Sequence, residues 1–434
     1  MKEVDIIISG CLVVTMDKEF KVYEDGFIAI EGNHLVAIGE SNLSSQFKAN
    51  TIIDGKDKLA MPGLINTHTH APMVYFRGYA DDLSLKEWLE EHIWPLERKF
   101  VNPDFVKEAV KLAALEMLKS GTTTFLDMYF AENEMAYVLK DIGIRSFLGE
   151  GILGFPTPVS PTPEAGLRRT EELIKNWKDD ELISPVVSPH APYTCSEELL
   201  RSASGLARDY DVPLHIHLAE EKWEVEKIQA EKGMSPVEYL NNLGLLREKT
   251  SAAHVNWVSK KDIEILAQTK TGVAHNPESN MKLATGICPV PDMLKAGVKV
   301  GLGTDSATSN NNLDMFGEMD MAAKLHKITR KNPTVLKAKE VVMMATIGGA
   351  EVLGVANEIG SLEPNKKADL ILLSLNQPHL VPLYDVYSQI VYAASGSDVD
   401  TVIVNGKILI KERKALTIDE EEVINKAKEF SKKL

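Results

Sequence analysis

Several histidines and one aspartate in this sequence have the types and spacing of metal ligands. His68 and His70 are separated by one residue, and residues i and i+2 of a β-strand point to the same side. The other candidates, His217, His254 and Asp305, lie far along the chain. Neutral imidazole and carboxylate suit zinc or iron, and three or four protein ligands leave a position for water. These residues therefore indicate a divalent-metal site, provided that the fold brings them together.

The elements that must position these residues follow from the pattern between residues 59 and 361. Eight short apolar segments alternate with segments of helical periodicity such as NPDFVKEAVKLAALEMLKSG, and this alternation predicts parallel strands. We therefore expect a (β/α)₈ barrel, whose functional groups lie at the carboxyl ends of the strands. The residues that close its strands are His68 and His70 on the first, His190 on the fourth, His217 on the fifth, His254 on the sixth, His275 on the seventh and Asp305 on the eighth.

The two ends of the chain have a different pattern from its middle. Residues 1–58 contain β-branched runs broken by Gly, Asn and Asp. Residues 362–434 contain the similar runs ADLILLSL and VDTVIVNGKILIKE, with a hairpin signal at Asn405-Gly406. We expect the two ends to pair into one small β-sandwich domain beside the barrel, so that the fold class is α/β with a discontinuous second domain.

Composition and charge restrict the class of ligand. The 434 residues carry a formal net charge of -15, whereas a nucleic-acid ligand requires clustered Lys and Arg. The sequence has no run of about 20 apolar residues that would span a membrane, and its first residues lack the pattern of a secretion signal. Three widely spaced cysteines suit reduced thiols and exclude a zinc site made of cysteines. We expect a cytoplasmic protein, free to form homo-oligomers, that acts on a small molecule.

Six segments of the sequence resemble motifs of the amidohydrolase superfamily: PGLINTHTH, HIHLAE, SAAHV, HNPESNMKLATGICPV, GTDSATSNNNLDM and IGSLEPNKKADLILL. They occur in the family's order over essentially the whole chain. They are most similar to its branch of aminohydrolases and chlorohydrolases, and within it to the deaminases of S-adenosylhomocysteine and 5′-methylthioadenosine. Ser306, where a glycine often follows the aspartate, and Met281 in the SNxK segment depart from the commonest pattern near the pocket.

The resemblance implies a centre with a single metal ion. Its ligands would be His68, His70, His217 and Asp305, and strand geometry agrees, because 68 and 70 share a face. Members of the superfamily with two metals need a carboxylated lysine at the end of the fourth strand. Here that strand ends at His190 with no lysine nearby. We expect one divalent ion, with Zn²⁺ preferred and Fe²⁺ as the alternative.

The resemblance also implies catalytic and substrate-binding roles in a hydrolytic deamination. Asp305, together with His254, would accept a proton from the attacking water. Glu220 would protonate the ring nitrogen beside the carbon that loses its amino group. The substrate contacts besides Glu220 would be Glu97 at the ribose hydroxyls, His190 at the purine or ribose, and Arg169 or Arg168 at the carboxylate of a homocysteine tail.

The expected function is therefore deamination of a purine nucleoside derived from adenosine. The alternative enzyme is a deaminase or dechlorinase of another ring, such as guanine or an s-triazine. A catalytically inactive scaffold is less consistent with the sequence, because every expected ligand is present. Several of these residues also have a simpler interpretation without a role in catalysis. Glu220 could be a solvated glutamate at a helix start, and Glu97 a surface charge. Of the other histidines, His215 is expected to be a core residue with its hydrogen bonds satisfied, and His275 is either structural or pocket-lining.

Overall fold

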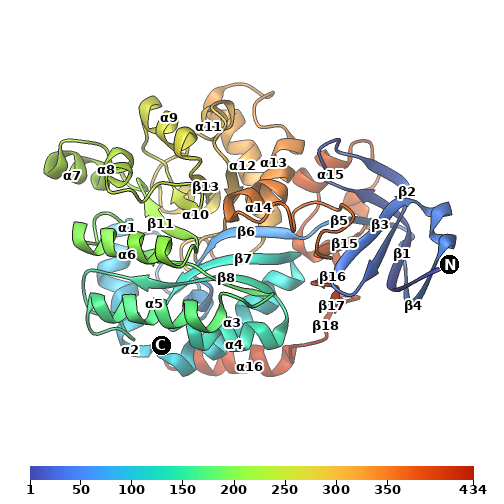
Figure 1. Ribbon diagram of the computed structural model, residues 1–434, viewed down its shortest axis with the longest axis horizontal. Coiled ribbons are helices and arrows are strands. Elements are labelled where there is room, and N and C mark those ends of the chain that lie inside the picture. Colours follow the sequence, from blue (N-terminus) through green and yellow to red (C-terminus); the bar gives the residue numbers. More distant parts are fainter.

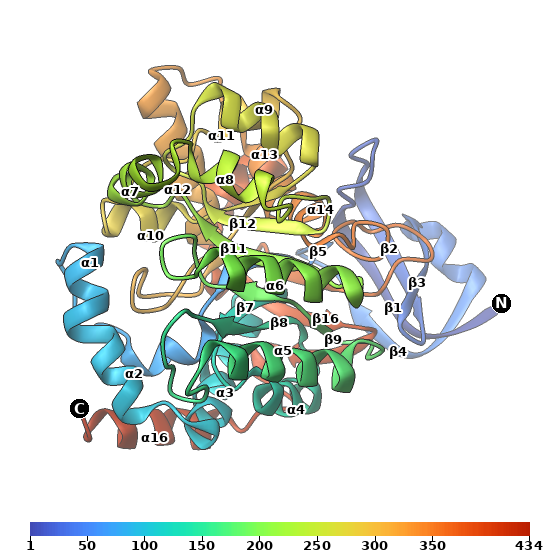
Figure 2. The same cartoon turned by 60° about the vertical axis from the view of Figure 1, so that its left-hand side comes forward.

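The computed structural model describes all 434 residues, which form one sheet from the two chain ends and two parallel sheets flanked by helices (Figure 1). The sheet of the chain ends lies at one end of the molecule. Helices α1 (Leu85–Glu87) and α2 (Trp94–Phe100) lie at the opposite end, as Figure 2 also shows. No helix is long and apolar enough to cross a bilayer.

The sheet of the chain ends has nine strands joined in one hydrogen-bonded network. The expected pairing of both ends is present, because β15 pairs with β5 and β5 pairs with β1. A separate cluster of buried apolar side chains, which includes Ile8, Ile28 and Leu370, stabilises it. The strands are β1 (Lys2–Val14), β2 (Val22–Glu31), β3 (His34–Glu40), β4 (Phe47–Asp54), β5 (Lys58–Pro62), β15 (Leu370–Ser374), β16 (Val399–Val404), β17 (Lys407–Lys411) and β18 (Lys414–Ala415).

The segment KLAMPGLINTH, expected as one barrel strand, is two strands in the structure. Its first part is β5, which belongs to the sheet of the chain ends, and its second part is β6 (Leu64–Thr69). Gly63 separates them, and a Cβ there would lie 2.1 Å from the Thr123 hydroxyl oxygen. Glycine is therefore required at this close approach, where the chain passes from one sheet to the next.

Two parallel sheets carry the strands that precede the candidate ligands. One has the order β10-β8-β7-β6, with β9 paired to β8, and the other has the order β11-β12-β13-β14. Isolated parallel bridges at Thr69–Asp305 and Val187–Leu214 link the two sheets at both of their edges. The strands are β6, β7 (Thr122–Tyr129), β8 (Arg145–Ile152), β9 (Ile183–Pro185), β10 (Ser188–Pro189), β11 (Leu214–Leu218), β12 (Thr250–His254), β13 (Gly272–His275) and β14 (Val300–Leu302).

Helices follow the parallel strands in the alternation that the sequence predicts. Between β6 and β7 the chain makes a longer excursion through η2 (Ala71–Phe76), α1, the π-helical η3 (Trp88–Ile93) and α2. The other helices of this part are α3 (Pro103–Lys119), α4 (Glu132–Ile142), α5 (Pro163–Trp177), α6 (Glu197–Asp209), α7 (Lys222–Lys232), α8 (Pro236–Asn242), α9 (Lys260–Thr269), α10 (Pro277–Lys282), α11 (Val290–Lys295), α12 (Met315–Arg330), α13 (Ala338–Ala345) and α14 (Ile347–Leu353).

The sequence predicts that residues 362–434 belong to the small domain of the chain ends. Two helices in this range pack against other helices instead of the sheet. Helix α15 (Val386–Tyr392) packs against α12 and α13. Helix α16 (Glu420–Ser431) lies along α3, where Lys119 pairs with Glu420 at 2.6 Å (Figure 1). Their apolar faces are buried among the helices, so only β15 to β18 of this range contribute strands to the sheet.

Candidate metal centre and active-site cavity

The four expected metal ligands converge at the carboxyl ends of the parallel strands. The Nε2 atoms of His68 and His70 lie 3.4 and 3.3 Å from Oδ1 of Asp305. The Nε2 atoms of His70 and His217 are 3.3 Å apart. Bonds of about 2.0–2.1 Å to a tetrahedral zinc ion would separate neighbouring ligand atoms by roughly 3.3 Å. The three measured distances match this spacing, and the group of His68, His70 and Asp305 could hold one divalent ion, with His217 next to His70.

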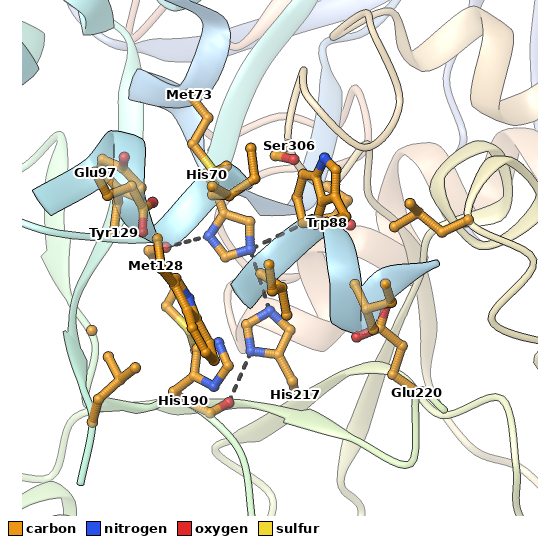
Figure 3. Close-up of a pocket in the computed structure, with 18 of the residues that line it drawn as sticks. His70, Met73, Trp88, Glu97, Met128, Tyr129, His190, His217, Glu220 and Ser306 are labelled. Carbon is orange, nitrogen blue, oxygen red and sulfur yellow. Dashed lines mark hydrogen bonds and ion pairs between the residues drawn. The ribbon is translucent and has the colours of Figure 1, made fainter. Parts of the chain in front are cut away.

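The second ring nitrogens of two ligands fix which nitrogen faces the centre. Nδ1 of His70 donates to the carbonyl oxygen of Met128, and Nδ1 of His217 donates to that of His190 at 2.8 Å (Figure 3). With the protons held on Nδ1, the lone pairs of both Nε2 atoms point into the site. A backbone acceptor behind a histidine is the usual way to set the tautomer of a metal ligand.

His68 is oriented by a second histidine rather than by a carbonyl group. Its Nδ1 lies 2.8 Å from Nε2 of His215, whose Nδ1 lies 2.7 Å from the Ser251 hydroxyl. Nε2 of His68 is buried and has no partner, as expected of an atom that binds a metal ion. His215 is thus a buried core histidine with hydrogen-bond partners for both ring nitrogens, which agrees with its simpler interpretation. In addition, it contacts a ligand directly, a role that was not anticipated.

Asp305 is held by hydroxyl groups on its outer oxygen. Its Oδ2 accepts hydrogen bonds from Ser279 at 2.6 Å and Ser309 at 2.9 Å, which leaves Oδ1 facing the histidines. The neighbouring His68 holds the pKa of this carboxyl well below its usual range, although burial alone would raise it. The backbone of Asp305 has a φ of 59°, a left-handed conformation that is uncommon outside functional sites for non-glycine residues.

His254 lies beside the four expected ligands, and together with His68 and His217 it forms a second group that could hold a metal ion. Its Nδ1 lies 2.8 Å from Oδ1 of Asn280, and its Nε2 is buried with no hydrogen-bond partner. That Nε2 lies 3.7 Å from a carboxylate oxygen of Glu220. Its backbone is also left-handed, with a φ of 71°. His254 can therefore interact with a molecule bound between the metal ligands and Glu220.

Glu220 is buried at the cavity, so it is not the solvated helix-start residue of its simpler interpretation. Burial and the nearby charge of Asp305 raise the pKa of its carboxyl well above the usual value, which favours its protonated form. Glu224, not identified from the sequence, fixes the turn by accepting from the backbone N–H groups of Ala219 and Glu220 at 3.1 and 2.9 Å. A buried, protonated carboxyl beside a metal site is suited to donate a proton.

A cavity of about 690 Å³ opens over these residues. We call the group of His68, His70, His217, His254 and Asp305 the floor, and all of these residues except His68 line the cavity. We call the apolar part of the lining the apolar wall, and its members used here are Trp88, Trp94, Phe130 and Leu153. His190 also faces the cavity, with its Nδ1 2.9 Å from the Thr194 hydroxyl. The indole nitrogen of Trp88 and the phenol of Tyr129 are buried without partners, and both residues line the cavity.

Glu97 reaches the cavity from α2, at the apolar wall. Figure 3 places it on the far side of His70 and His217 from Glu220, close to Tyr129. Its side chain is buried, and that burial raises the pKa of its carboxyl to about 7. The interpretation of Glu97 as an ordinary surface charge is therefore wrong. A cavity with one carboxyl near the floor and another at the wall can hold a ligand at two points.

The structure does not bring Arg169 into the cavity. Its guanidinium group lies 2.7 Å from Glu134 and 3.2 Å from Glu150. Glu150 is buried at the end of β8, where an unpaired carboxylate would be costly, and Arg169 compensates its charge. Neither Arg169 nor Arg168 lines the cavity, so the structure offers no contact in support of their expected role at the substrate, and that role stays a prediction.

Two further buried groups complete the surroundings. Asp127, at the end of β7, accepts from the Thr69 hydroxyl at 2.5 Å and from the Ala71 backbone N–H at 2.6 Å, and so fixes the chain on both sides of His70. His275 pairs with His326, with 3.2 Å between their Nε2 atoms, and does not line the cavity. The open question about His275 is therefore decided in favour of a structural position.

Histidine and aspartate side chains that could hold a divalent ion, set at the ends of parallel strands below a cavity, indicate a metal-dependent enzyme of the hydrolase type. A model of the amidohydrolase family matches residues 59–409, and the chain belongs to this family. Sequence and structure searches bear out the resemblance described above.

The chain is 48% identical over 424 residues to a 5-methylthioadenosine/S-adenosylhomocysteine deaminase of Thermodesulfovibrio yellowstonii, covering 97% of each protein. It is 45% identical to a 5′-deoxyadenosine deaminase of Methanosarcina acetivorans, covering 99% of this chain and 98% of the other. Among solved structures it is similar to an adenosine deaminase from Xanthomonas campestris with bound zinc. That match has a TM-score of 0.98 and 36% identity, and covers 100% of this chain and 99% of the other.

Proposed function

We propose that this protein is a metal-dependent deaminase of adenosine derivatives such as 5′-methylthioadenosine and S-adenosylhomocysteine. The observation that carries the proposal is the buried carboxyl of Glu220, which lines the same cavity as His70, His217 and Asp305. The names of the full-length relatives agree with it. In the reaction, water adds its oxygen to the ring carbon that bears the amino group. One water hydrogen ends on the adjacent ring nitrogen, and the other leaves with ammonia.

The residues of the floor would hold one divalent ion, most simply Zn²⁺. The set of three imidazoles and one carboxylate suits zinc, and a solved relative contains it. When bound, the ion would supply Lewis-acid activation of water, which lowers the pKa of water from 15.7 to about 7. Metal analysis of the purified protein should find about one equivalent per chain. Two equivalents would contradict a single-metal centre.

The protein's own groups would move the protons. Asp305 would accept a proton from water and later deliver it to the leaving nitrogen, and His254 would stabilise the charge that develops on the attacking oxygen. Glu220 would donate its proton to the ring nitrogen, so that negative charge does not accumulate there, and it would regain a proton from the hydroxyl group on the ring carbon as the carbonyl forms and ammonia leaves. Glu224 supports this role, because it holds the backbone of Glu220 in place.

Substrate orientation would rest on the opposite side of the cavity. Glu97 would accept hydrogen bonds from the ribose hydroxyls, and His190 would contact the purine or ribose. Guanine and s-triazines carry no ribose, so the buried carboxyl of Glu97 favours a nucleoside over these rings.

The test of the proposed function is ammonia release measured side by side on 5′-methylthioadenosine, S-adenosylhomocysteine, adenosine and guanine. We expect turnover of at least one 5′-substituted adenosine and none of guanine. Turnover of guanine alone would overturn the proposal.

We also infer that the two parallel sheets form one closed (β/α)₈ barrel within residues 59–361, beside a domain made from 1–58 and 362–434. The bridges at Thr69–Asp305 and Val187–Leu214 support closure at both edges. An experimental structure in which either edge is open to solvent would contradict it.

A further inference from the structure

We propose that Asn280 and Asn256 are positioning residues, which together fix the ring proton of His254 on Nδ1 and leave its Nε2 unprotonated toward the cavity. The use of that nitrogen in catalysis rests on the proposed function, whereas the place of the proton does not. Both asparagines are buried, and neither lines the cavity. They would therefore act through His254 and not by contact with the substrate.

The direction of the hydrogen bonds is set at the backbone of Glu220. Its carbonyl oxygen lies 3.1 Å from Nδ2 of Asn256, and because a carbonyl oxygen only accepts, this contact requires the amide nitrogen of Asn256. The second hydrogen of that nitrogen goes to the Thr285 hydroxyl at 3.2 Å. The amide oxygen of Asn256 is therefore left to accept a hydrogen bond on its other side.

Asn280 passes this direction on to His254. Its Nδ2 donates to Oδ1 of Asn256 at 2.9 Å. Its Oδ1 then faces Nδ1 of His254 at 2.8 Å, and it also accepts from the Thr285 hydroxyl at 3.3 Å. Because an amide oxygen only accepts, the bond to His254 requires a proton on Nδ1, and the neutral ring then has none on Nε2.

A third asparagine, Asn276, favours the opposite tautomer. Its Nδ2 lies 3.3 Å from Nδ1 of His254, and a hydrogen bond donated from there would move the ring proton to Nε2. No hydrogen bond fixes the orientation of this amide, because its Oδ1 is buried without a partner. Asn280 is closer to Nδ1 and is held by two neighbours, so its requirement prevails.

The same contacts hold Glu220 and His254 at a fixed separation. The backbone N–H groups of Asn256 and Trp257 both donate to the carbonyl oxygen of Ala219 at 3.0 Å, so the turn after β11 is tied to the turn after β12. The carbonyl group of Glu220 is bound by Asn256, and its N–H group by Glu224. Nε2 of His254 lies 3.7 Å from the Glu220 carboxyl. Asn256 therefore contacts the backbone of one proposed proton-transfer residue and, through Asn280, the ring of the other.

In the proposed reaction, this tautomer determines what His254 can do. An unprotonated Nε2 accepts a hydrogen bond from the attacking water. As that O–H bond weakens, the ring gains positive character and stabilises the charge that develops on the oxygen. With the proton on Nε2, the ring could not accept from the water. The orientation of two buried amides would thus affect turnover although neither side chain reaches the cavity.

Heteronuclear NMR of the intact zinc-loaded protein, with labelled histidine nitrogens, tests the tautomer directly, because it distinguishes protonated from unprotonated ring nitrogens. The signals of His254 are assigned by their loss in His254→Phe. We expect the proton on Nδ1. In Asn280→Leu, Asn276 is the remaining neighbour of Nδ1 and can donate to it, so we expect part of the population to carry the proton on Nε2. A proton on Nε2 in the unaltered protein, or a tautomer that is the same in Asn280→Leu, would overturn the proposal.

Kinetics of the same variants test the consequence for turnover. In Asn280→Leu, kcat for 5′-methylthioadenosine should fall by about 10- to 100-fold, while KM stays within about threefold and zinc content at about one equivalent. Thr285→Val is the matched control, because it removes only the two longer bonds of the network. Its tautomer should be unchanged and its loss of kcat smaller.

Equal values of kcat in the two variants, or a loss that lies in KM alone, would refute the positioning role of Asn280. If Asn280→Leu does not fold, the NMR of the unaltered protein still decides the place of the proton. If the unaltered protein deaminates no adenosine derivative, the proposed function fails, and the NMR result separates that failure from an error in the tautomer.

Discussion

The side chains of the floor and those of the apolar wall are held in position by different interactions. On the floor, hydrogen bonds from other strands or loops hold the expected ligands from behind, such as the bond between His68 and His215 or the one that Ser279 donates to Asp305. On the wall, side chains such as Trp94 and Phe130 are held by packing, and the indole nitrogen of Trp88 has no hydrogen-bond partner.

This difference assigns a separate task to each side. The floor needs a fixed geometry, because a metal ion tolerates only small errors in the positions of its ligands, and hydrogen bonds with a defined direction provide it. Packed aromatic and aliphatic groups such as those of the wall are suited to recognise a ligand by its shape. Changes on the floor should therefore reduce turnover or metal binding, whereas changes on the wall should alter substrate preference.

The largest expected effect belongs to Asp305, which contacts two metal ligands. Asp305→Ala removes a ligand and the proposed proton acceptor together, so we expect turnover to fall by about 10⁴-fold or more. The fold should persist, and circular dichroism with a thermal unfolding curve would establish this. Activity within tenfold of the unaltered protein would exclude Asp305 from the mechanism.

Replacement of Glu220 separates proton transfer from metal binding on the same side of the cavity. Glu220→Gln keeps the size of the side chain but cannot donate an acidic proton, so we expect kcat to fall by about 10³-fold. Metal content should stay at about one equivalent, because Glu220 is not a ligand. A variant that lost its metal would show instead that Glu220 supports the floor, and unchanged kcat would refute its role as proton donor.

His215 tests whether the floor depends on groups behind the ligands. His215→Phe removes the partner of Nδ1 of His68 with little change in volume, so we expect metal affinity to weaken by about 10- to 100-fold. Competition with a chelator would measure the affinity, and the visible spectrum of a Co²⁺-loaded sample would report the ligand geometry. Ser251→Ala is the matched control, because it removes only the outer link and should weaken binding less. Equal affinities in all three proteins would show that His215 only fills space.

The contrast between floor and wall also explains what the sequence could and could not predict. The ligands of the floor are recognisable because each follows an apolar strand, and the family's motifs include them. The groups behind them are not recognisable in the same way. The contact between His68 and His215 depends on how two strands distant in sequence face each other, and Glu224 acts only through the turn at Ala219. Neither arrangement produces a recognisable local pattern in the sequence.

The structural details that the sequence does not predict have a common physical origin. The segment before β6 is apolar throughout, and periodicity alone does not indicate that Gly63 divides it between two sheets. Arg169 lies on an amphipathic helix, and its sequence does not reveal that the buried Glu150 requires its charge. Helices α15 and α16 are contiguous in sequence with strands of the small domain, so the sequence places them there. Their apolar faces pack against α12 and α13 and against α3.

The smallest expected effect concerns Glu97, the charged group of the wall. Glu97→Gln keeps a hydrogen-bonding group but weakens acceptance from ribose hydroxyls, so we expect KM for nucleosides to rise about tenfold, with a smaller change in kcat. Metal content should not change. A fall in kcat with unchanged KM would assign Glu97 to the chemical step instead of to substrate binding.

The same variant should change the dependence of stability on pH. Burial raises the pKa of Glu97 from its ordinary value of 4.5 to about 7, so between these values the folded protein keeps a proton that the unfolded chain has lost. The contribution of Glu97 to stability therefore declines as pH rises through this window, and glutamine has no such dependence. Between pH 5 and pH 8, the free energy of unfolding of Glu97→Gln should gain roughly 1–3 kcal/mol relative to the unaltered protein. Urea unfolding of both metal-loaded proteins would measure it. A difference that stays constant with pH would mean that water reaches this carboxyl and that its pKa is not raised in the folded protein.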